Sequence, residues 1–240
     1  MPNHFFNFKQ FTVQQEHCAM KVCTDACVLG AFTAEHFSKG QAEPFKMLDI
    51  GSGTGLLSLM LAQKLSGTIQ AIEMNEAAAR QARENFESSP WAENLELVQG
   101  DIQSFDAPWQ YDLIISNPPF FEADLRSSNA PKNEAKHDTG LTLQELVEVL
   151  NKHLSPLGSA TILLPYHRTN YFKDLCKQAS LFVSEVLLLH QSPAHTAFRS
   201  IVLLSKVETP YTENSLIIHD EQRQYGSAFT ALLQEYYLKL

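Results

Sequence analysis

The feature that most constrains the fold is a regular alternation of short apolar segments with amphipathic helical patterns, which begins near residue 46. The segments expected to be strands are 46–50, 68–73, 95–98, 111–116 and 160–164. The segments expected to be helices lie between them, at 54–65, 76–87 and 143–150, with Asn75 placed to cap the second. Strand–helix–strand units favour a parallel sheet with right-handed crossovers and helices on both faces. The pattern therefore predicts an α/β, doubly wound domain.

Segments on either side of this alternation extend the domain. Two strands at 182–189 and 200–205 are close enough in sequence to pair antiparallel, and a last helix is expected over 227–237. Residues 8–38 contain a short strand-like piece and then a helix that Thr24 could cap. A chain of 240 residues is a usual size for one domain. We expect a single domain with an N-terminal extension (1–43), a core (44–206) and a C-terminal strand and helix (207–240).

The charge is unevenly distributed along the chain. The net charge is −9, yet residues 25–149 hold 8 basic and 19 acidic residues, whereas residues 150–206 hold six basic and two acidic residues and four histidines. A protein that coats nucleic acid non-specifically needs Lys and Arg to neutralise phosphates, so the acidic total argues against that class. The basic segment still allows local contact with RNA.

The cysteines and the N-terminal segment indicate a cytoplasmic protein. Cys18, Cys23, Cys27 and Cys176 form no Cys-x-x-Cys pair, which argues against a metal knuckle and for reduced thiols. The first residues lack the basic and apolar regions of a signal peptide, and no apolar run approaches the roughly 20 residues of a membrane span.

A glycine-rich segment, Asp49-Ile-Gly51-Ser-Gly53-Thr-Gly55, joins the first expected strand to the first helix. Glycines allow a sharp turn and a close approach of the backbone to a ligand. A dinucleotide fingerprint would need a further glycine where Leu56 stands, and the carboxylate of Asp49 would repel a pyrophosphate. Asp49 suits a ligand that carries an ammonium group, such as the methionine end of S-adenosylmethionine (SAM).

Two more carboxylates follow the next two strands. Glu73 ends the second strand, where it can accept hydrogen bonds from both ribose hydroxyls, and Asp101 follows the third, where it can accept the adenine amino group. Ligands of open α/β sheets bind outside the carboxyl ends of the strands. With Asp49, these residues predict a SAM site at that edge.

The fourth strand ends in Ser116-Asn117-Pro118-Pro119-Phe120. The two prolines keep the chain extended and offer no N–H, so the segment presents acceptors. The side-chain oxygen of Asn117 and the carbonyl of Pro118 can accept both hydrogens of one planar amine, which localises the nitrogen lone pair toward a methyl donor. Phe120 supplies a face on which a base can stack.

Together, Asp49–Gly55 and Asn117–Phe120 resemble the amino-methyltransferases that carry an Asn-Pro-Pro-aromatic motif. Within them the chain is similar, over roughly residues 7–240, to the family of bacterial tRNA1(Val) adenine-37 N6-methyltransferases. The segments that carry this similarity are Phe8–Phe11, Cys18–Asp25, Leu29–Ala31, Leu56–Gln63, Ser89–Glu93 and Ala228–Gln234.

The resemblance implies a Rossmann-like class I SAM-dependent methyltransferase with a seven-stranded, mostly parallel sheet, a C-terminal antiparallel strand pair and a short N-terminal extension. It implies SAM as cofactor and transfer of its methyl group to the N6 amine of a tRNA adenine, adenine 37 of the anticodon loop. The implied catalytic residues are Asn117, Pro118, Pro119 and Phe120. The implied cofactor contacts are Lys21, Thr24, Asp25, Asp49, Gly51, Gly53, Gly55, Glu73, Met74, Asp101, Ile102 and Asn117.

Two positions depart from the family pattern. Many relatives have Tyr at the position of Phe120, so a hydroxyl contact is absent while stacking is kept. Cys23 stands where Gly is common, beside the segment from Lys21 to Asp25 that would close the methionine side of the pocket.

The basic segment, residues 150–206, is the candidate RNA surface. The chain is expected to be a monomer that acts on tRNA and does not bind membranes. Its candidate residues are Lys152, Arg168, Lys173, Lys177 and Arg199, with His167, His190 and His195. Arg126, Lys132 and Lys136, in a long polar loop at 120–140, are further candidates. Three alternatives stay open: guanine-N2 methylation of ribosomal RNA, glutamine N-methylation of a protein, and a non-catalytic SAM-fold module.

Overall fold

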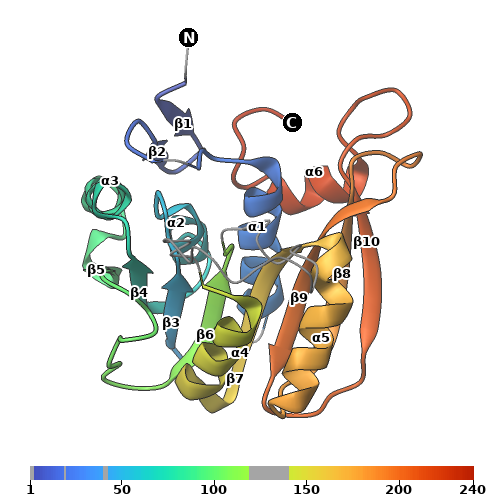
Figure 1. The fold of residues 1–240 in the computed structure, drawn as a ribbon. Helices are drawn as coiled ribbons and strands as arrows, with labels where there is room; N and C mark the ends of the chain where they lie inside the picture. The colour runs from blue at the N-terminus through green and yellow to red at the C-terminus, as the bar shows by residue number, and fades with distance from the viewer. Residues whose placement is uncertain (1–2, 19, 40–42, 119–140) are drawn as a thin grey trace, which may run out of the picture.

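The computed structural model describes residues 3–18, 20–39, 43–118 and 141–240. Its centre is an eight-stranded sheet with the order β10-β8-β9-β7-β6-β3-β4-β5 (Figure 1). All neighbouring strands in it pair in parallel except β9, which is antiparallel to β7 and to β8. The strands are β3 (Phe45–Ile50), β4 (Gly67–Glu73), β5 (Leu95–Gln99), β6 (Tyr111–Ser116), β7 (Leu154–Pro165), β8 (Phe182–His190), β9 (Ala197–Ser205) and β10 (Thr212–Ile217).

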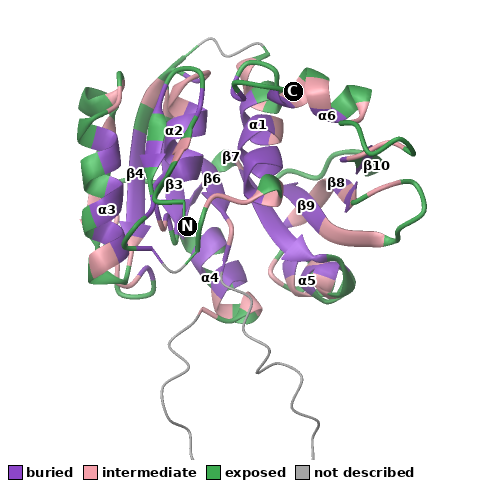
Figure 2. Cartoon of the chain, turned by 90° about the horizontal axis from the view of Figure 1, so that it is seen from above, coloured by how far each residue is buried: buried purple, intermediate pink, exposed green. Residues whose placement is uncertain are grey.

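Helices cover both faces of this sheet, as Figures 1 and 2 show. One face carries α1 (Thr24–Ser38), α2 (Leu56–Ala62), α3 (Glu76–Glu87) and α6 (Ser227–Leu233). The other carries α4 (Leu143–His153) and α5 (Thr169–Gln178). Single turns of 3-10 helix lie at η1 (Ala92–Asn94) and η3 (Tyr166–Arg168), and a separate hairpin pairs β1 (Phe5–Asn7) with β2 (Thr12–Gln14).

The two-faced core follows from the strand sequences. Consecutive residues of a strand point to opposite faces, so Met47 belongs to the cluster under α1 and α2, whereas Leu48 belongs to the cluster under α4 and α5. Both residues are fully buried, as are Ile114 and Ile115 in β6, which divide in the same way. A strand buried on both faces reads as a continuous apolar run, which is why these strands were visible in the sequence.

The predicted α/β fold, its parallel core strands and the antiparallel pairing of β8 with β9 are confirmed. The sheet has eight strands, one more than the seven expected, because β10 pairs with β8 at the sheet edge. The expectation that Thr24 caps the first helix is wrong: Thr24 is already helical, and Cys23 stands at the cap position in extended conformation without a side-chain hydrogen bond. Asn75, by contrast, caps α3 through the N–H of Ala78 at 3.0 Å.

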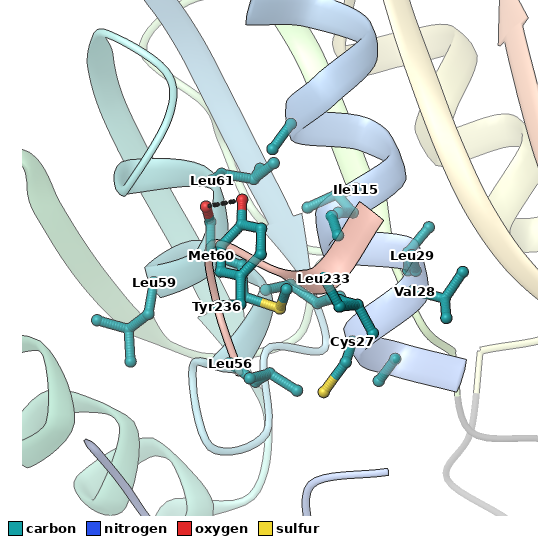
Figure 3. Close-up of a cluster of buried hydrophobic side chains, with 14 of the residues drawn as sticks. Cys27, Val28, Leu29, Leu56, Leu59, Met60, Leu61, Ile115, Leu233 and Tyr236 are labelled. Carbon is teal, nitrogen blue, oxygen red and sulfur yellow. Dashed lines mark hydrogen bonds between the residues drawn. The ribbon is translucent and has the colours of Figure 1, made fainter. Parts of the chain in front are cut away.

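The two ends of the chain meet beside α2. Phe8 forms an antiparallel bridge with Tyr237, and the N–H of Lys9 donates to the carbonyl of Tyr236 at 2.8 Å. Figure 3 shows the ring of Tyr236 buried among the side chains of α1 and α2, with its hydroxyl donating to the carbonyl of Met60 at 3.0 Å. The N-terminal hairpin is thereby fixed next to the glycine-rich segment.

Within the described residues, no helix has the length and apolar character needed to cross a membrane. The four cysteines are free thiols, three of them buried.

Candidate active site

Four predicted polar residues meet at the carboxyl edge of the sheet. Asp49 lies in β3, Glu73 ends β4, Asp101 follows β5 and Asn117 follows β6. These strands are neighbours in the order β6-β3-β4-β5, so their parallel carboxyl ends form one continuous edge. This edge is where open α/β sheets bind ligands.

The glycine-rich loop between β3 and α2 is tied to the end of β4. The N–H groups of Gly51 and Ser52 donate to the carbonyl of Ile72 at 2.9 and 3.1 Å. The N–H of Gly53 donates to Glu73 Oε2 at 2.8 Å. Gly51, Gly53 and Gly55 have φ of 71°, 54° and 79°, the left-handed region that favours glycine.

The three glycines differ in what surrounds them. A Cβ built on Gly51 or Gly53 would meet no atom within 4 Å, whereas one on Gly55 would collide with the ring of Phe86. Gly55 is therefore required by the packing of α2 against α3. Gly51 and Gly53 instead line open space, into which a ligand can approach the backbone.

Asp49 is fully buried at the start of this loop. Its Oδ2 accepts hydrogen bonds from the hydroxyl of Ser58 at 2.7 Å and the N–H of Ser58 at 3.2 Å. Its Oδ1 is buried and has no partner among the described residues. Burial raises the pKa of Asp49 to about 7; the nearby charge of Glu73 adds to this effect and the Ser58 hydrogen bonds oppose it.

The carboxylates of Glu73 and Asp101 are each held by a hydrogen bond from a nearby backbone N–H. Glu73 Oε1 accepts from the N–H of Asn75 at 2.8 Å, and Asp101 Oδ1 accepts from the N–H of Gln103 at 2.9 Å. A carboxylate oxygen has more than one acceptor position, so both groups keep capacity for a ligand hydroxyl or amine. Next to them, the side chain of Met74 is 48% exposed, while Ile102 is buried in the core.

Asn117 presents an acceptor at the end of β6. Its Nδ2 lies 3.7 Å from the sulfur of Met20, and its Oδ1 is buried without a partner among the described residues. Pro118 is buried. Pro119 and Phe120, and the loop residues Arg126, Lys132 and Lys136, lie outside the described residues.

The first turn of α1 contributes an ion pair that the sequence did not indicate. Asp25 Oδ2 accepts from Arg199 Nε at 2.9 Å, and the two side chains are only 14% and 30% exposed. Asp25, which was assigned to cofactor contact, and Arg199, which was assigned to RNA contact, thus form an ion pair with each other. Lys21 is exposed and donates to the carbonyl of Asn3 at 3.2 Å, while Thr24 begins α1.

The basic segment is divided between the two edges of the sheet. Arg168, at the start of α5, follows the carboxyl end of β7. Arg199 lies near the start of the antiparallel β9. Both therefore lie at the carboxyl edge of the sheet, which is called the catalytic edge below. Lys177 lies at the far end of α5, toward the opposite edge. Lys173, between them, contacts the ring of Tyr211 at 4.3 Å. The remaining candidates also divide: His167, His190 and His195 lie at the catalytic edge, and Lys152 lies at the far end of α4.

Two residues that hold the site were missed in the sequence. Ser58 positions Asp49, and Asn85, which is 1% exposed, donates to the carbonyls of Thr54 and Gln14 at 2.8 and 2.9 Å. Asn85 therefore joins the glycine loop to the N-terminal hairpin. The sequence offered one indication of their roles: Ser58 and Asn85 are polar residues on the otherwise apolar side of their helices.

These features fit SAM. Backbone turns that face open space can approach a ligand closely. The atoms Asp49 Oδ1, Ser52 Oγ and Asn117 Oδ1 are three of the five buried side-chain polar atoms without a partner in the described part of the chain. Buried polar groups nearly always have hydrogen-bond partners, so a ligand with donors, such as an ammonium group or an amine, satisfies this edge.

Comparison with known proteins agrees with this geometry. The model of the methyltransferase small domain matches residues 30–179. Proteins from Bacteroides fragilis and Cytophaga hutchinsonii, both named tRNA1(Val) (adenine(37)-N6)-methyltransferase, are 36% and 39% identical to the chain, with 100% of each protein and of the chain covered.

Solved structures share the fold at low identity. A predicted O-methyltransferase from Agrobacterium tumefaciens has a TM-score of 0.66 at 17% identity, over 88% of this chain and 96% of that one. A ribosomal protein L11 methylase from Lactobacillus delbrueckii has a TM-score of 0.56 at 15% identity, over 80% and 83%. The architecture is that of the class I SAM-dependent methyltransferases.

Proposed function

Because the chain belongs to the tRNA1(Val) (adenine(37)-N6)-methyltransferase family, we propose that it methylates the N6 amine of adenine 37 in the anticodon loop of that tRNA, with SAM as methyl donor. The observation that carries the proposal is the buried Oδ1 of Asn117, which has no partner in the described part of the chain and lies at the same edge as the glycine loop. An acceptor held out of water beside a cofactor site is what an amine substrate requires.

The residues that would hold the cofactor come from four adjacent strand ends. Asp49 would face the ammonium of the methionine part, Glu73 the ribose hydroxyls and Asp101 the adenine amine. Gly51 and Gly53 would let the backbone approach closely, and Lys21, Thr24, Asp25, Gly55, Met74 and Ile102 would complete the surroundings. When bound, SAM supplies an electrophilic methyl group on a sulfonium.

Asn117 and Pro118 would orient the substrate amine. The nitrogen lone pair of adenine N6 is delocalised into the ring and is a weak nucleophile. Hydrogen bonds from both N–H groups, to Asn117 Oδ1 and to the Pro118 carbonyl, favour the tetrahedral nitrogen that forms as the methyl group arrives. An acceptor that is already in place, and needs no reorientation, stabilises that state most. Proposed stacking of the base on Phe120 would fix its plane.

The flipped adenine must leave its stack, which costs a few kcal/mol and least in a loop. A tRNA substrate implies a cytoplasmic location. The proposal takes one chain to be sufficient, since every candidate group named above comes from the same chain.

The test is a methylation assay with labelled SAM and bulk tRNA, followed by digestion to nucleosides. The expected product is N6-methyladenosine, located at position 37 by comparison with tRNA in which that adenine is replaced. Label in N2-methylguanosine would establish the ribosomal-type alternative instead. Label in added protein and none in RNA would establish glutamine methylation, and SAM binding without any transfer would leave a non-catalytic module.

A further inference from the structure

A second pocket lies at the same edge of the sheet but away from the glycine loop. It has a volume of about 770 Å3 and lies between the loop after β8 (191–195) and the turn after β10 (219–223). Figure 1 shows these two loops, in orange and red, extending beyond the sheet near α6. None of the residues assigned to the cofactor or to catalysis lines it.

The two walls of this pocket are joined by hydrogen bonds. The N–H of His219 donates to the carbonyl of Gln191 at 3.1 Å. The side-chain amide of Gln191 lies 3.0 Å from Nδ1 of His219. With this amide nitrogen as donor, Nδ1 of His219 accepts, which corresponds to the tautomer that carries its hydrogen on Nε2. The imidazole is thus held in one orientation.

A stack of aromatic rings lies behind His219. Its imidazole stacks on Tyr225, with ring centres 5.1 Å apart, and Tyr225 stacks on the buried ring of Phe229 at 4.8 Å. The opposite wall offers His195, whose Nδ1 lies 2.7 Å from the hydroxyl of Ser192. A flat ring backed by further rings, with polar groups at its edges, is the arrangement on which proteins stack unpaired RNA bases.

Arg223 adds a charge in a strained conformation. Its φ is +62°, which is rare for a long side chain, and the turn that imposes it is fixed by Asp220 Oδ1, which accepts from the N–H groups of Gln222 and Gln224 at 2.9 and 2.8 Å. Strain of this kind persists where surrounding bonds enforce it, and it concentrates at binding sites. With Asp220 committed to the turn, the guanidinium of Arg223 is suited to an RNA phosphate and the exposed Glu221 to a base amine.

The pocket is also at a suitable distance from Asn117. In the sheet, β8 lies three strand positions from β6, and β10 lies four. The three strands β6, β8 and β10 run in the same direction, so their carboxyl ends lie at the same edge. At about 4.8 Å per strand step this is roughly 14–19 Å. Stacked nucleotides advance about 3.4 Å each, so roughly four to six nucleotides span that distance.

We propose that this pocket binds one unstacked nucleotide of the same RNA whose adenine is presented to Asn117, with its base against His219 and its phosphate near Arg223. The inference rests on the proposed RNA methylation. It adds a second point of contact that selects the RNA by the spacing between the two nucleotides.

The test uses the double variant His219→Ala with Arg223→Asn, since Asn tolerates positive φ and keeps the turn. The Kd for an anticodon stem-loop RNA should rise at least tenfold, while the Kd for SAM and the kcat at saturating RNA stay within about twofold. The control is Arg83→Asn, which removes one exposed positive charge from α3 at the far end of the sheet and should change neither value.

A second measurement identifies the nucleotide. Abasic residues are placed one at a time in the RNA, and one position other than the methylated adenine should weaken binding to the wild type but not to the double variant. An unchanged RNA Kd in the double variant, or an equal loss in the Arg83 control, would overturn the inference. The inference would also be overturned if the wild type bound free nucleoside monophosphates tightly and the double variant did not, while both bound the RNA equally well. Failure of the wild type to methylate RNA at all would instead refute the proposed function.

Discussion

The carboxylate of Asp49 is held where its charge is costly. Its Oδ1 has no partner among the residues that the structure describes, and burial raises the pKa to about 7, so below that pH the folded protein retains a proton that the unfolded chain has lost. The folded state is therefore destabilised as pH rises from about 4 to 7. A cationic ligand reverses this cost, because it favours the ionised form.

We expect the SAM affinity of the wild type to rise about tenfold between pH 6 and pH 8, as Asp49 ionises through its pKa of about 7. Asp49→Asn should bind SAM at least tenfold more weakly at pH 8, with no such rise, and should melt at a higher temperature than the wild type without ligand at that pH. Calorimetric titration and thermal melts at both pH values measure this. Equal pH dependence in the two proteins would contradict the role of Asp49.

Asn117→Ala should lower kcat by at least a thousandfold, because the amine loses the acceptor that favours its tetrahedral state. The Kd for SAM should change by less than about threefold, because the glycine loop and the three carboxylates remain. Single-turnover methylation and SAM titration separate the two effects. A parallel collapse of SAM binding would assign Asn117 to the cofactor instead.

At the scale of single residues, the sequence predicted which groups share the site but not how they are held. Asp49, Glu73, Asp101 and Asn117 were found because each lies at or just after the end of a recognisable strand, and parallel strands end at one edge. The pair of Asp25 with Arg199 was not found, because its members are 174 residues apart and no local pattern joins them. The positions of Pro119 and Phe120 lie outside the described residues and stay predictions.

At the scale of elements, the loop from β3 to α2 separates two uses of glycine. Gly55 has no room for a side chain because of Phe86, whereas Gly51 has room and a positive φ. Gly55 is therefore fixed by packing, whereas the space beside Gly51 is open, as the proposed cofactor contact requires.

Gly55→Ala should lower the free energy of unfolding by about 3 kcal/mol or more, from overpacking against Phe86 added to the cost of positive φ. Gly51→Ala should cost only about 1–2 kcal/mol, from φ alone, yet weaken SAM binding by the larger factor. Urea unfolding and SAM titration of the two variants form the comparison. The opposite order in either measurement would show that the open space beside Gly51 is not the cofactor site.

Elements with strong apolar patterns were predictable with their bounds, whereas β10 was expected only as a strand somewhere within residues 207–240. β3 and β6 are buried on both faces and read as apolar runs, whereas β10 has the sequence Thr-Glu-Asn-Ser-Leu-Ile and is exposed at every residue but Leu216. An edge strand of this kind has almost no apolar period. The start of α2 moved from the expected Thr54 to Leu56 because Gly55 is left-handed and cannot continue a helix backward.

At the scale of the whole molecule, the acidic total and the proposed RNA substrate are compatible because a small number of the basic residues that the structure describes, among them Arg168 and Arg199, gather at the carboxyl edge. Arg168 lies there, with its guanidinium 4.9 Å from the ring of Tyr171, while Lys177 lies toward the opposite edge. RNA contact by so few charges is weak and local, which suits an enzyme that must release its product.

We expect Arg168→Ala to weaken RNA binding and to reduce the slope of log K against log salt by about 0.7, the value for one phosphate contact on a single strand. Lys177→Ala should leave the slope nearly unchanged. Binding titrations between 50 and 200 mM salt, roughly the range over which such slopes are resolved, compare the two. A larger effect from Lys177 would place the RNA on the other edge.

The bridge between Phe8 and Tyr237 also sets the order of events during synthesis. Some 230 residues separate the two, and at about 5–20 residues per second a ribosome needs roughly 10–45 seconds to make them. For that time the first hairpin lacks this contact and is held by earlier partners such as Asn85, which also binds the glycine loop. The contact between the first hairpin and Tyr237 is therefore among the last of the fold to form on the ribosome, long after the residues of the glycine loop have been made.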